Sequence, residues 1–332
     1  MENRVEKYKN WEYKINFSKD VNKFEINYPN KKLDPDTLSK YYSINECSIE
    51  SIENNNFYVS QPEDFNDLFD TAYNILDFNQ LYLNCILSLS PKNQEENIRH
   101  HWETHKEFFI NSIKKDSYRA LLARFGILCT TENKLNELMW GYYNNNEGFL
   151  LEFNYKEFPK NFHGPFPINY VKTIDKIKTN NIDHLTFLLQ SNIKKDIWKH
   201  ENEYRFLVES DSEYLKVRGI WEDSELDRLR IEQNISFKER IMPYSSKSIK
   251  AIYLGFNFLK GEKILDTGNP YRIEFISEKK DLKKRLLDSI ITQEMNCYSI
   301  IQNVKNFELE CERWDIKFIN TYEYEINKID AC

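Results

Sequence analysis

Short apolar runs and stretches with helical spacing alternate along this chain, a pattern typical of mixed α and β structure. Apolar runs bounded by turn residues predict strands at 126–131, 149–153, 249–255 and 271–276, and a closing strand pair at 307–322. Apolar residues at helical spacing predict helices at 44–54, 73–89, 98–125, 183–195 and 281–291. We therefore expect an α+β fold with a mixed or antiparallel core sheet and helical insertions.

The same pattern divides the chain into three parts. Residues 1–35 are polar and rich in turn residues, apart from a short strand predicted at 23–28, and we interpret them as an N-terminal extension. Residues 36–276 form the predicted core, with a helical insertion at about 71–125, and residues 277–332 add a C-terminal helix plus strands. The strongly charged segment 211–233 is expected to be a solvated excursion.

One stretch, Trp198–Phe206, places two acids just before a guanidinium. Glu201 and Glu203 are two positions apart, and Arg205 follows at the same spacing. If the stretch is extended, these three side chains share one face of a strand and the mostly aromatic neighbours occupy the other. Buried carboxylates are costly unless they are paired or used in chemistry, so the pattern indicates either an active face or an ordinary ion-pair ladder.

Two further segments carry polar or aromatic side chains that a site could use. Asn66, Asp67 and Asp70 crowd one loop, where capping of a helix is favoured over metal binding. Trp140 and Tyr143 lie between two predicted strands, and they either pack in the core or stack on a planar ligand. Periodicity does not choose between these two roles.

Charge and cysteine usage narrow the class of protein. The net charge is −7 and the pI is near 5.6, which gives no general attraction to nucleic acid or anionic membrane. The 6 cysteines show no CxxC spacing, as expected of reduced thiols in a cytoplasm. No apolar run approaches the length of a membrane span, and the charged start argues against export. His101 and His105 have helical spacing but no third ligand nearby, so we expect no metal site.

The order of several motifs resembles a widespread bacterial family of domains of unknown function. The motifs are FYVSQPEDFNDLFD at 57–70, GILC at 126–129, MWGYY at 139–143, GFLLEF at 148–153, ENEYR at 201–205 and IYLG at 252–255. The resemblance covers about residues 36–276. That family in turn is similar to the ADP-ribosyltransferase fold, some branches of which serve in bacterial toxin and anti-phage defence systems.

The resemblance implies a split core sheet and NAD as the substrate. In such enzymes a polar residue of the first strand, a Tyr or Ser of the second and a late Glu form the catalytic set. It implies catalytic roles for Glu203 and Glu201, and NAD-binding roles for Tyr42, Tyr58, Ser60, Asn66, Asp67, Trp140, Tyr143 and Arg205. The chain departs from the pattern because its first strand lacks the usual His or Arg and the loop before Gly148 lacks a His.

Alternatives stay open at this point. The acceptor of a transferred group is a protein, a nucleic acid, a small molecule or water. A nucleotide-sensing or protein-interaction module would bind the same ligand without turning it over. A metal-dependent nuclease would need clustered acids, which Asp67, Asp70, Glu201 and Glu203 could supply, but no Asp/Glu-x-Lys motif follows the strand. The sequence does not set the oligomeric state.

Overall fold

The large sheet at the centre of the protein is 11-stranded and mixed, which confirms the predicted α+β class. The computed structural model describes residues 4–16, 23–29, 35–72, 75–78, 83, 87, 90–179, 183–209 and 240–329. The predicted excursion at 211–233 lies outside the described residues. No helix among the described residues is long and apolar enough to cross a membrane.

The strands of this sheet come from the whole length of the chain. They are β4 (Leu38–Tyr42), β7 (Phe125–Thr131), β8 (Phe149–Phe153), β9 (Phe162–Pro167), β13 (Glu203–Glu209), β15 (Ile249–Leu254), β16 (Lys263–Asp266), β17 (Tyr271–Glu274), β18 (Cys297–Asn303), β19 (Glu308–Asn320) and β20 (Glu323–Ile329). Their order is β16-β17-β20-β19-β18-β15-β8-β4-β7-β13-β9. β15 and β18 run parallel, and the other neighbours pair antiparallel.

Four of the strands expected from apolar runs are confirmed, as β7, β8, β15 and β17. The closing strand pair expected at 307–322 is wrong, because Glu308–Asn320 is one long strand that pairs with β18 on one side and β20 on the other. No Gly or Pro interrupts that segment, so nothing turns the chain before Asn320.

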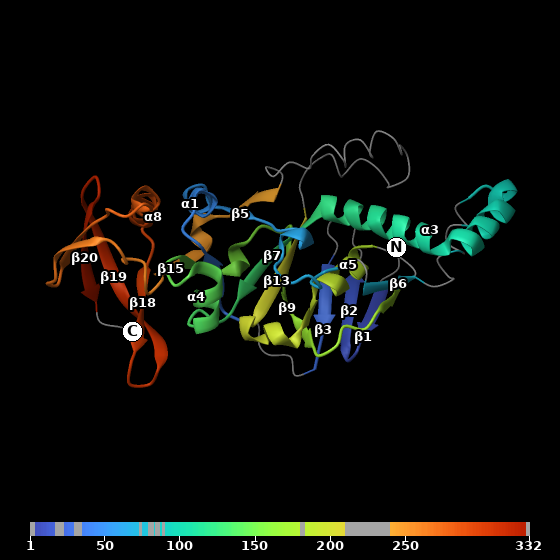
Figure 1. Ribbon diagram of the computed structural model, residues 1–332, viewed down its shortest axis with the longest axis horizontal. Coiled ribbons are helices and arrows are strands. Elements are labelled where there is room, and N and C mark those ends of the chain that lie inside the picture. Colours follow the sequence, from blue (N-terminus) through green and yellow to red (C-terminus); the bar gives the residue numbers. More distant parts are fainter. Residues whose placement is uncertain are drawn as a thin grey trace.

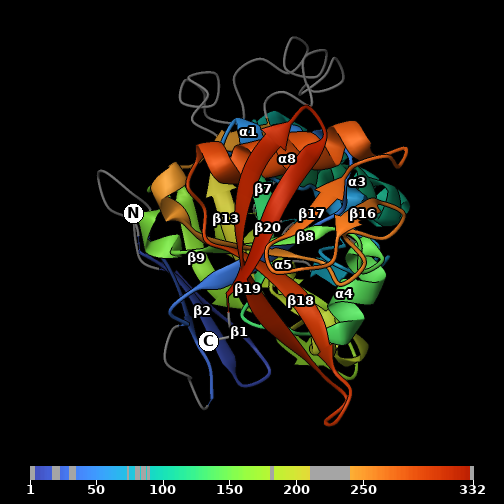
Figure 2. The same cartoon turned by 90° about the vertical axis from the view of Figure 1, so that its left-hand side faces the viewer.

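Helices and a small sheet cover the two faces of the large sheet. On one face lie α1 (Glu46–Glu53) and α8 (Lys280–Thr292), which contact each other and bury Ile49, Ile52, Leu286, Leu287 and Ile290 (Figure 2). On the other face lies α5 (His184–Ser191), which buries Leu185 and Leu188. The remaining helices are α3 (Glu95–Arg124) and α4 (Glu137–Asn144).

The segment expected to be an N-terminal extension packs on the core. β1 (Arg4–Tyr8), β2 (Trp11–Asn16) and β3 (Lys23–Asn27) form an antiparallel sheet. Tyr13 and Ile15 of this sheet are buried in the same cluster as Leu207 of β13. In Figure 1 these strands (blue) and the C-terminal strands (red) lie on opposite sides of β7 and β13.

Short strands replace helix at two predicted positions. The helix expected at 183–195 ends at Ser191, and β12 (Ile193–Lys195) follows and pairs with β10 (Asn169–Val171). The helix expected at 73–89 is wrong at β6 (Leu76–Phe78), which pairs with β11 (Ile177–Thr179), and much of the rest lies outside the described residues. The last short pair is β5 (Asn56–Tyr58) with β14 (Ile241–Pro243).

The large sheet is weakest between β4 and β7. β4 pairs with β8 along its whole length, from Leu38 to Tyr42. With β7 it shares a single register pair, Ser39 with Thr131. The two strands therefore diverge from that point, and side chains from both can line a space between them.

We expect Gly148→Ala to destabilise the protein by about 2 kcal/mol or more. A Cβ at Gly148 would lie 2.1 Å from the carbonyl oxygen of Tyr42, a backbone atom that cannot move without disturbing β4. Gly141 is the matched control because a Cβ there meets no atom within 4 Å, and alanine in the middle of α4 should stabilise by up to about 1 kcal/mol. Urea unfolding of both variants measures the difference, and equal stabilities would contradict the packing described for Gly148.

Candidate functional site

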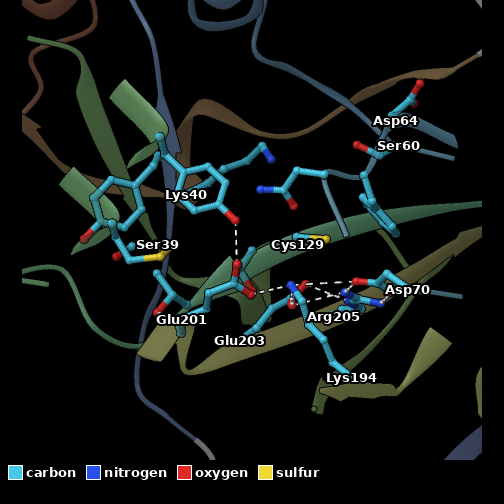
Figure 3. Close-up of a pocket in the computed structure, with 17 residues that line it drawn as sticks. Ser39, Lys40, Ser60, Asp64, Asp70, Cys129, Lys194, Glu201, Glu203 and Arg205 are labelled. Carbon is cyan, nitrogen blue, oxygen red and sulfur yellow. Dashed lines mark hydrogen bonds and ion pairs between the residues drawn. The ribbon is translucent and has the colours of Figure 1, made fainter. Parts of the chain in front are cut away.

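A cavity of about 290 Å³ opens where β4 and β7 diverge (Figure 3). Its walls come from β4, β7 and β13, from the segment between residues 60 and 70, and from α4, β12 and the 3-10 helix that ends at Glu201. Its lining residues are Ser39, Lys40, Tyr41, Ser60, Asp64, Phe65, Asn66, Asp70, Cys129, Thr130, Thr131, Met139, Tyr143, Lys194, Glu201, Glu203 and Arg205. The cavity therefore combines four carboxylates with aromatic and hydroxyl side chains.

Arg205 is the centre of the charged cluster and is only 2% exposed. Its guanidinium donates to both oxygens of Asp70, at 2.7 and 2.5 Å, and to both oxygens of Glu203, at 2.6 and 3.1 Å. It also donates to the carbonyl oxygen of Ser191 at 2.7 Å and lies 5.0 Å from the ring centroid of Phe65. Bidentate pairing of this kind satisfies a guanidinium that water does not reach.

Lys194 joins a third acid to the cluster. Its Nζ lies 3.1 Å from Glu203 and 3.7 Å from Asp70, and it donates to Oε2 of Glu201. The ammonium and all three carboxylates are buried. Asp70, Glu201 and Glu203 are thus balanced by two cations, Lys194 and Arg205, through direct contacts.

The sequence pattern predicts that Glu201 and Glu203 lie on one strand. In the structure they come from two different elements. Residues 196–201 form a 3-10 helix that ends at Glu201, and Asn202 has a left-handed backbone with φ 46°. β13 begins only at Glu203. The extended conformation predicted for Trp198–Phe206 is therefore wrong up to Asn202, whose type tolerates the left-handed turn.

Local hydrogen bonds aim the Glu201 carboxylate at the cavity. Tyr143, from α4, donates to Oε1 of Glu201 at 2.5 Å, and Thr131 donates to its backbone carbonyl oxygen at 2.8 Å. The amide side chain of Asn66 in turn contacts the Tyr143 hydroxyl. The loop, α4 and the end of the 3-10 helix are therefore connected through one side chain.

Burial and the neighbouring charges shift the pKa values of the two glutamates in opposite directions. Burial by itself raises the pKa of Glu203, but Arg205 and Lys194 outweigh it and hold that pKa far below its usual range. For Glu201, burial and the negative charge of Glu203 raise the pKa, and Lys194 offsets only part of the rise. One carboxyl of the pair is held ionised while the other takes up a proton more readily.

Six of the residues expected to form a site line the cavity. They are Ser60, Asn66, Tyr143, Glu201, Glu203 and Arg205. Ser60 also forms a β-bridge with Ile127, which holds it against β7.

The other four predicted site residues lie elsewhere. Tyr42 is buried with its ring stacked on Phe149, and Trp140 is fully buried with its indole N–H donating to the carbonyl oxygen of Lys134. Tyr58 donates to Asp64, and Asp67 accepts from the backbone of Phe69. None of the four lines the cavity, so these side chains do not reach a ligand held there in this conformation.

Sequence reasoning did not assign Lys40, Cys129 and Lys194 to the site. Lys194 was expected inside a helix, where its side chain has no reason to face Glu203. Cys129 lies opposite Arg205 in the β7–β13 register, and its thiol contacts Glu203; burial raises the thiol pKa, so the sulfur stays protonated. Cys129 could have been identified only from the pairing of β7 with β13. That register depends on tertiary packing and is not visible in the sequence.

The acids considered for a metal-dependent nuclease are held mainly by contacts with cations of the protein. The described residues contain no group of three or more His, Cys, Asp or Glu side chains placed to hold a metal ion. Oxygens of Asp70, Glu201 and Glu203 are taken up by Arg205 and Lys194 instead. Asp67, the fourth acid considered, does not line the cavity.

Comparison with known proteins returned no match to a family model, to a curated protein or to a solved structure.

We expect Arg205→Met to destabilise the protein by about 3–5 kcal/mol, since it leaves Asp70 and Glu203 buried without their main cation. Arg285→Met is the control because its ion pairs with Glu46 and Glu53 are partly exposed, and its loss should cost less than about 1 kcal/mol. Chemical unfolding at pH 7 compares the two. Similar losses would show that the buried cluster does not hold the fold together.

The pH dependence of the free energy of unfolding should reveal the opposite pKa shifts of Glu203 and Glu201. Because the pKa of Glu203 is lowered from 4.5 on folding, its ionised form stabilises the protein above about pH 4.5, and this contribution is lost as the pH falls. The stability lost in Glu203→Gln relative to wild type should therefore shrink below that pH.

The stability of Glu201→Gln relative to wild type should change with pH in the opposite direction. The raised pKa of Glu201 means that its ionised form is disfavoured on folding, so this variant should gain stability relative to wild type as the pH rises through 4.5. Unfolding curves between pH 3 and 7 measure both differences. Parallel curves for the two variants would contradict the assignment.

Proposed function

We propose that this protein breaks the N-glycosidic bond of a nucleotide-type substrate, with NAD as the first candidate, and passes the ribosyl carbon to an acceptor. The observation that carries the proposal is a pair of buried glutamates in one cavity whose pKa values are shifted in opposite directions. Opposite shifts in one site are the arrangement that acid and base chemistry uses.

Glu203 is suited to stabilise the positive charge that develops on the ribose as the glycosidic bond breaks. Cleavage of a glycosidic bond passes through an oxocarbenium-like state, which a fixed carboxylate stabilises electrostatically. Arg205 and Lys194 keep Glu203 ionised and hold its side chain in place. No reorganisation of that carboxylate is then needed as the charge forms.

Glu201 is suited to proton transfer. Its raised pKa brings the protonated and ionised forms closer to balance, as a group that both takes and gives a proton requires. Lys194 and Tyr143 orient the carboxyl from two sides. Glu201 would deprotonate the acceptor or, when that acceptor is water, activate it.

The size and lining of the cavity favour one end of a dinucleotide over the whole molecule. Ligand pockets of drug-sized molecules typically occupy about 300–1,000 Å³, so about 290 Å³ suits a nicotinamide and its ribose. In this proposal the hydroxyl of Ser60 and the amide of Asn66 bind ribose oxygens, and the rings of Tyr41, Phe65 and Tyr143, which line the same cavity, offer surfaces for a planar group.

The resemblance to the ADP-ribosyltransferase fold is part of this proposal. Its support is the divergence of β4 and β7, since the proposed catalytic glutamate lies beside the gap in a sheet that is nearly split. A role as a toxin or anti-phage effector, and a macromolecular acceptor, follow from the resemblance alone.

A specific observation favours a second candidate, a nucleotide sensor without turnover. The carboxylate of Glu203 already accepts from Lys194, from Arg205 through two nitrogens and from the thiol of Cys129. A carboxylate with this many donors is well suited to hold the fold around a bound ligand. Turnover, rather than binding, therefore decides between the two candidates.

The decisive test is incubation of the purified protein with NAD labelled on its adenylate, with and without cell extract or nucleic acid. We expect release of nicotinamide, and Glu203→Gln should lower its rate by roughly 10²–10³-fold through loss of the stabilising charge. Glu152→Gln is the matched control, because Glu152 is a buried and paired carboxylate that does not line the cavity.

Each outcome has a distinct meaning. Label on a macromolecule establishes transfer and identifies the acceptor class, and free ADP-ribose establishes hydrolysis. Saturable NAD binding without nicotinamide release, measured by calorimetry, supports the sensor. Neither turnover nor binding would remove NAD as the ligand.

A further inference from the structure

Two lysines line the same cavity, but their surroundings differ. Lys194 is ion-paired with three carboxylates. Lys40, on β4, makes no ion pair and no hydrogen bond with its Nζ among the residues that the structure describes, and this nitrogen lies 5.7 Å from the ring centroid of Tyr42. Figure 3 shows Lys40 on the side of the cavity opposite Glu201 and Glu203.

The strand places Lys40 among apolar neighbours. Alternation along β4 puts it on the same face as Leu38 and Tyr42, and its cross-strand partner on β8 is Leu151. All three neighbours are buried in the core. A charged ammonium is costly at such a position because the neighbouring side chains on this face are apolar and no carboxylate of the described residues forms an ion pair with it.

Burial lowers the pKa of Lys40, and the negative charge of Glu203 offsets only part of the effect. Glu203 is already neutralised by its contacts with Arg205 and Lys194, so it does little for a third cation. A lysine that is desolvated in this way keeps more of its uncharged form, whose lone pair is a nucleophile.

We propose that Lys40 is a nucleophilic amine that forms an imine with an aldehyde or ketone ligand in the cavity. The cavity is large enough for a small carbonyl compound or for the open-chain end of a reducing sugar. The hydroxyls of Ser39 and Ser60 line the same space and can bind hydroxyl groups of such a ligand. This step is separate from glycosidic bond cleavage and needs no NAD.

The step balances without an oxidant or reductant. The lone pair of Nζ attacks the carbonyl carbon, and the π electrons of the C=O bond move to its oxygen. Both hydrogens of the neutral amine then leave with that oxygen as one molecule of water, and a C=N bond replaces the C=O bond. Water reverses the reaction, so the imine must be trapped to be observed.

The test uses glycolaldehyde as the carbonyl probe and sodium cyanoborohydride as the trapping reductant, with the full-length folded protein at pH 7. Peptide mass spectrometry locates the reduced adducts. An exposed lysine with a pKa of about 10.4 is roughly 0.04% uncharged at pH 7, so a desolvated amine has a large advantage. We expect Lys40 to be modified at least about tenfold faster than Lys194 and than the exposed lysines.

Three controls keep the result decisive. Lys40→Met should remove the fast adduct. Lys195→Met should not change it, because Lys195, which follows Lys194 in the sequence, does not line the cavity. In wild type unfolded by urea, the advantage of Lys40 should disappear, which covers the case in which Lys40→Met fails to fold. Labelling of Lys40 no faster than that of exposed lysines in the folded protein would overturn the proposal.

Because no NAD is added, this result is independent of the proposed glycosidic function. Fast labelling with no nicotinamide release would keep the amine and reject the NAD chemistry. Nicotinamide release without fast labelling would do the reverse.

Discussion

The pairing of Arg205 with Asp70 and Glu203 is the interaction on which the rest of the site depends. A guanidinium and two carboxylates are stable without water only if nearly every donor and acceptor finds a partner. Here the partners come from a loop, from β13 and from the carbonyl at the end of α5. Segments more than a hundred residues apart in the chain are therefore held together by one side chain.

The contacts of this cluster also explain why the pKa values of chemically similar groups in one cavity are shifted differently. Glu203 lies within direct contact of both cations and stays ionised, whereas Glu201 contacts one cation, Lys194, and feels the charge of Glu203. Lys194 lies among the carboxylates, whereas Lys40 lies beside apolar side chains of β4 and β8. Burial and the charges in direct contact, more than residue type, set the direction in which the pKa of each group is shifted.

The gap between β4 and β7 exposes the charged cluster to a cavity. A fully paired sheet would bury these charges beneath continuous backbone, and no ligand could reach them. Because the two strands share one register pair, side chains of both border an open space, which Tyr143 and Asn66 also line. The charges therefore face a cavity whose other walls carry hydroxyl and aromatic groups.

Local patterns determined the class of the fold, four strands of the large sheet and the choice of Glu201, Glu203 and Arg205 as candidates, because short-range periodicity and the cost of buried charge are properties of the chain itself. They could not place Tyr42 or Trp140, since an aromatic ring suits a core as well as a ligand. Only the tertiary structure brought Asp70 and Lys194 to the cluster around Arg205 and left Lys40 without a contacting carboxylate in the part of the chain that the structure describes, since these distances depend on strand order and on a left-handed turn at Asn202.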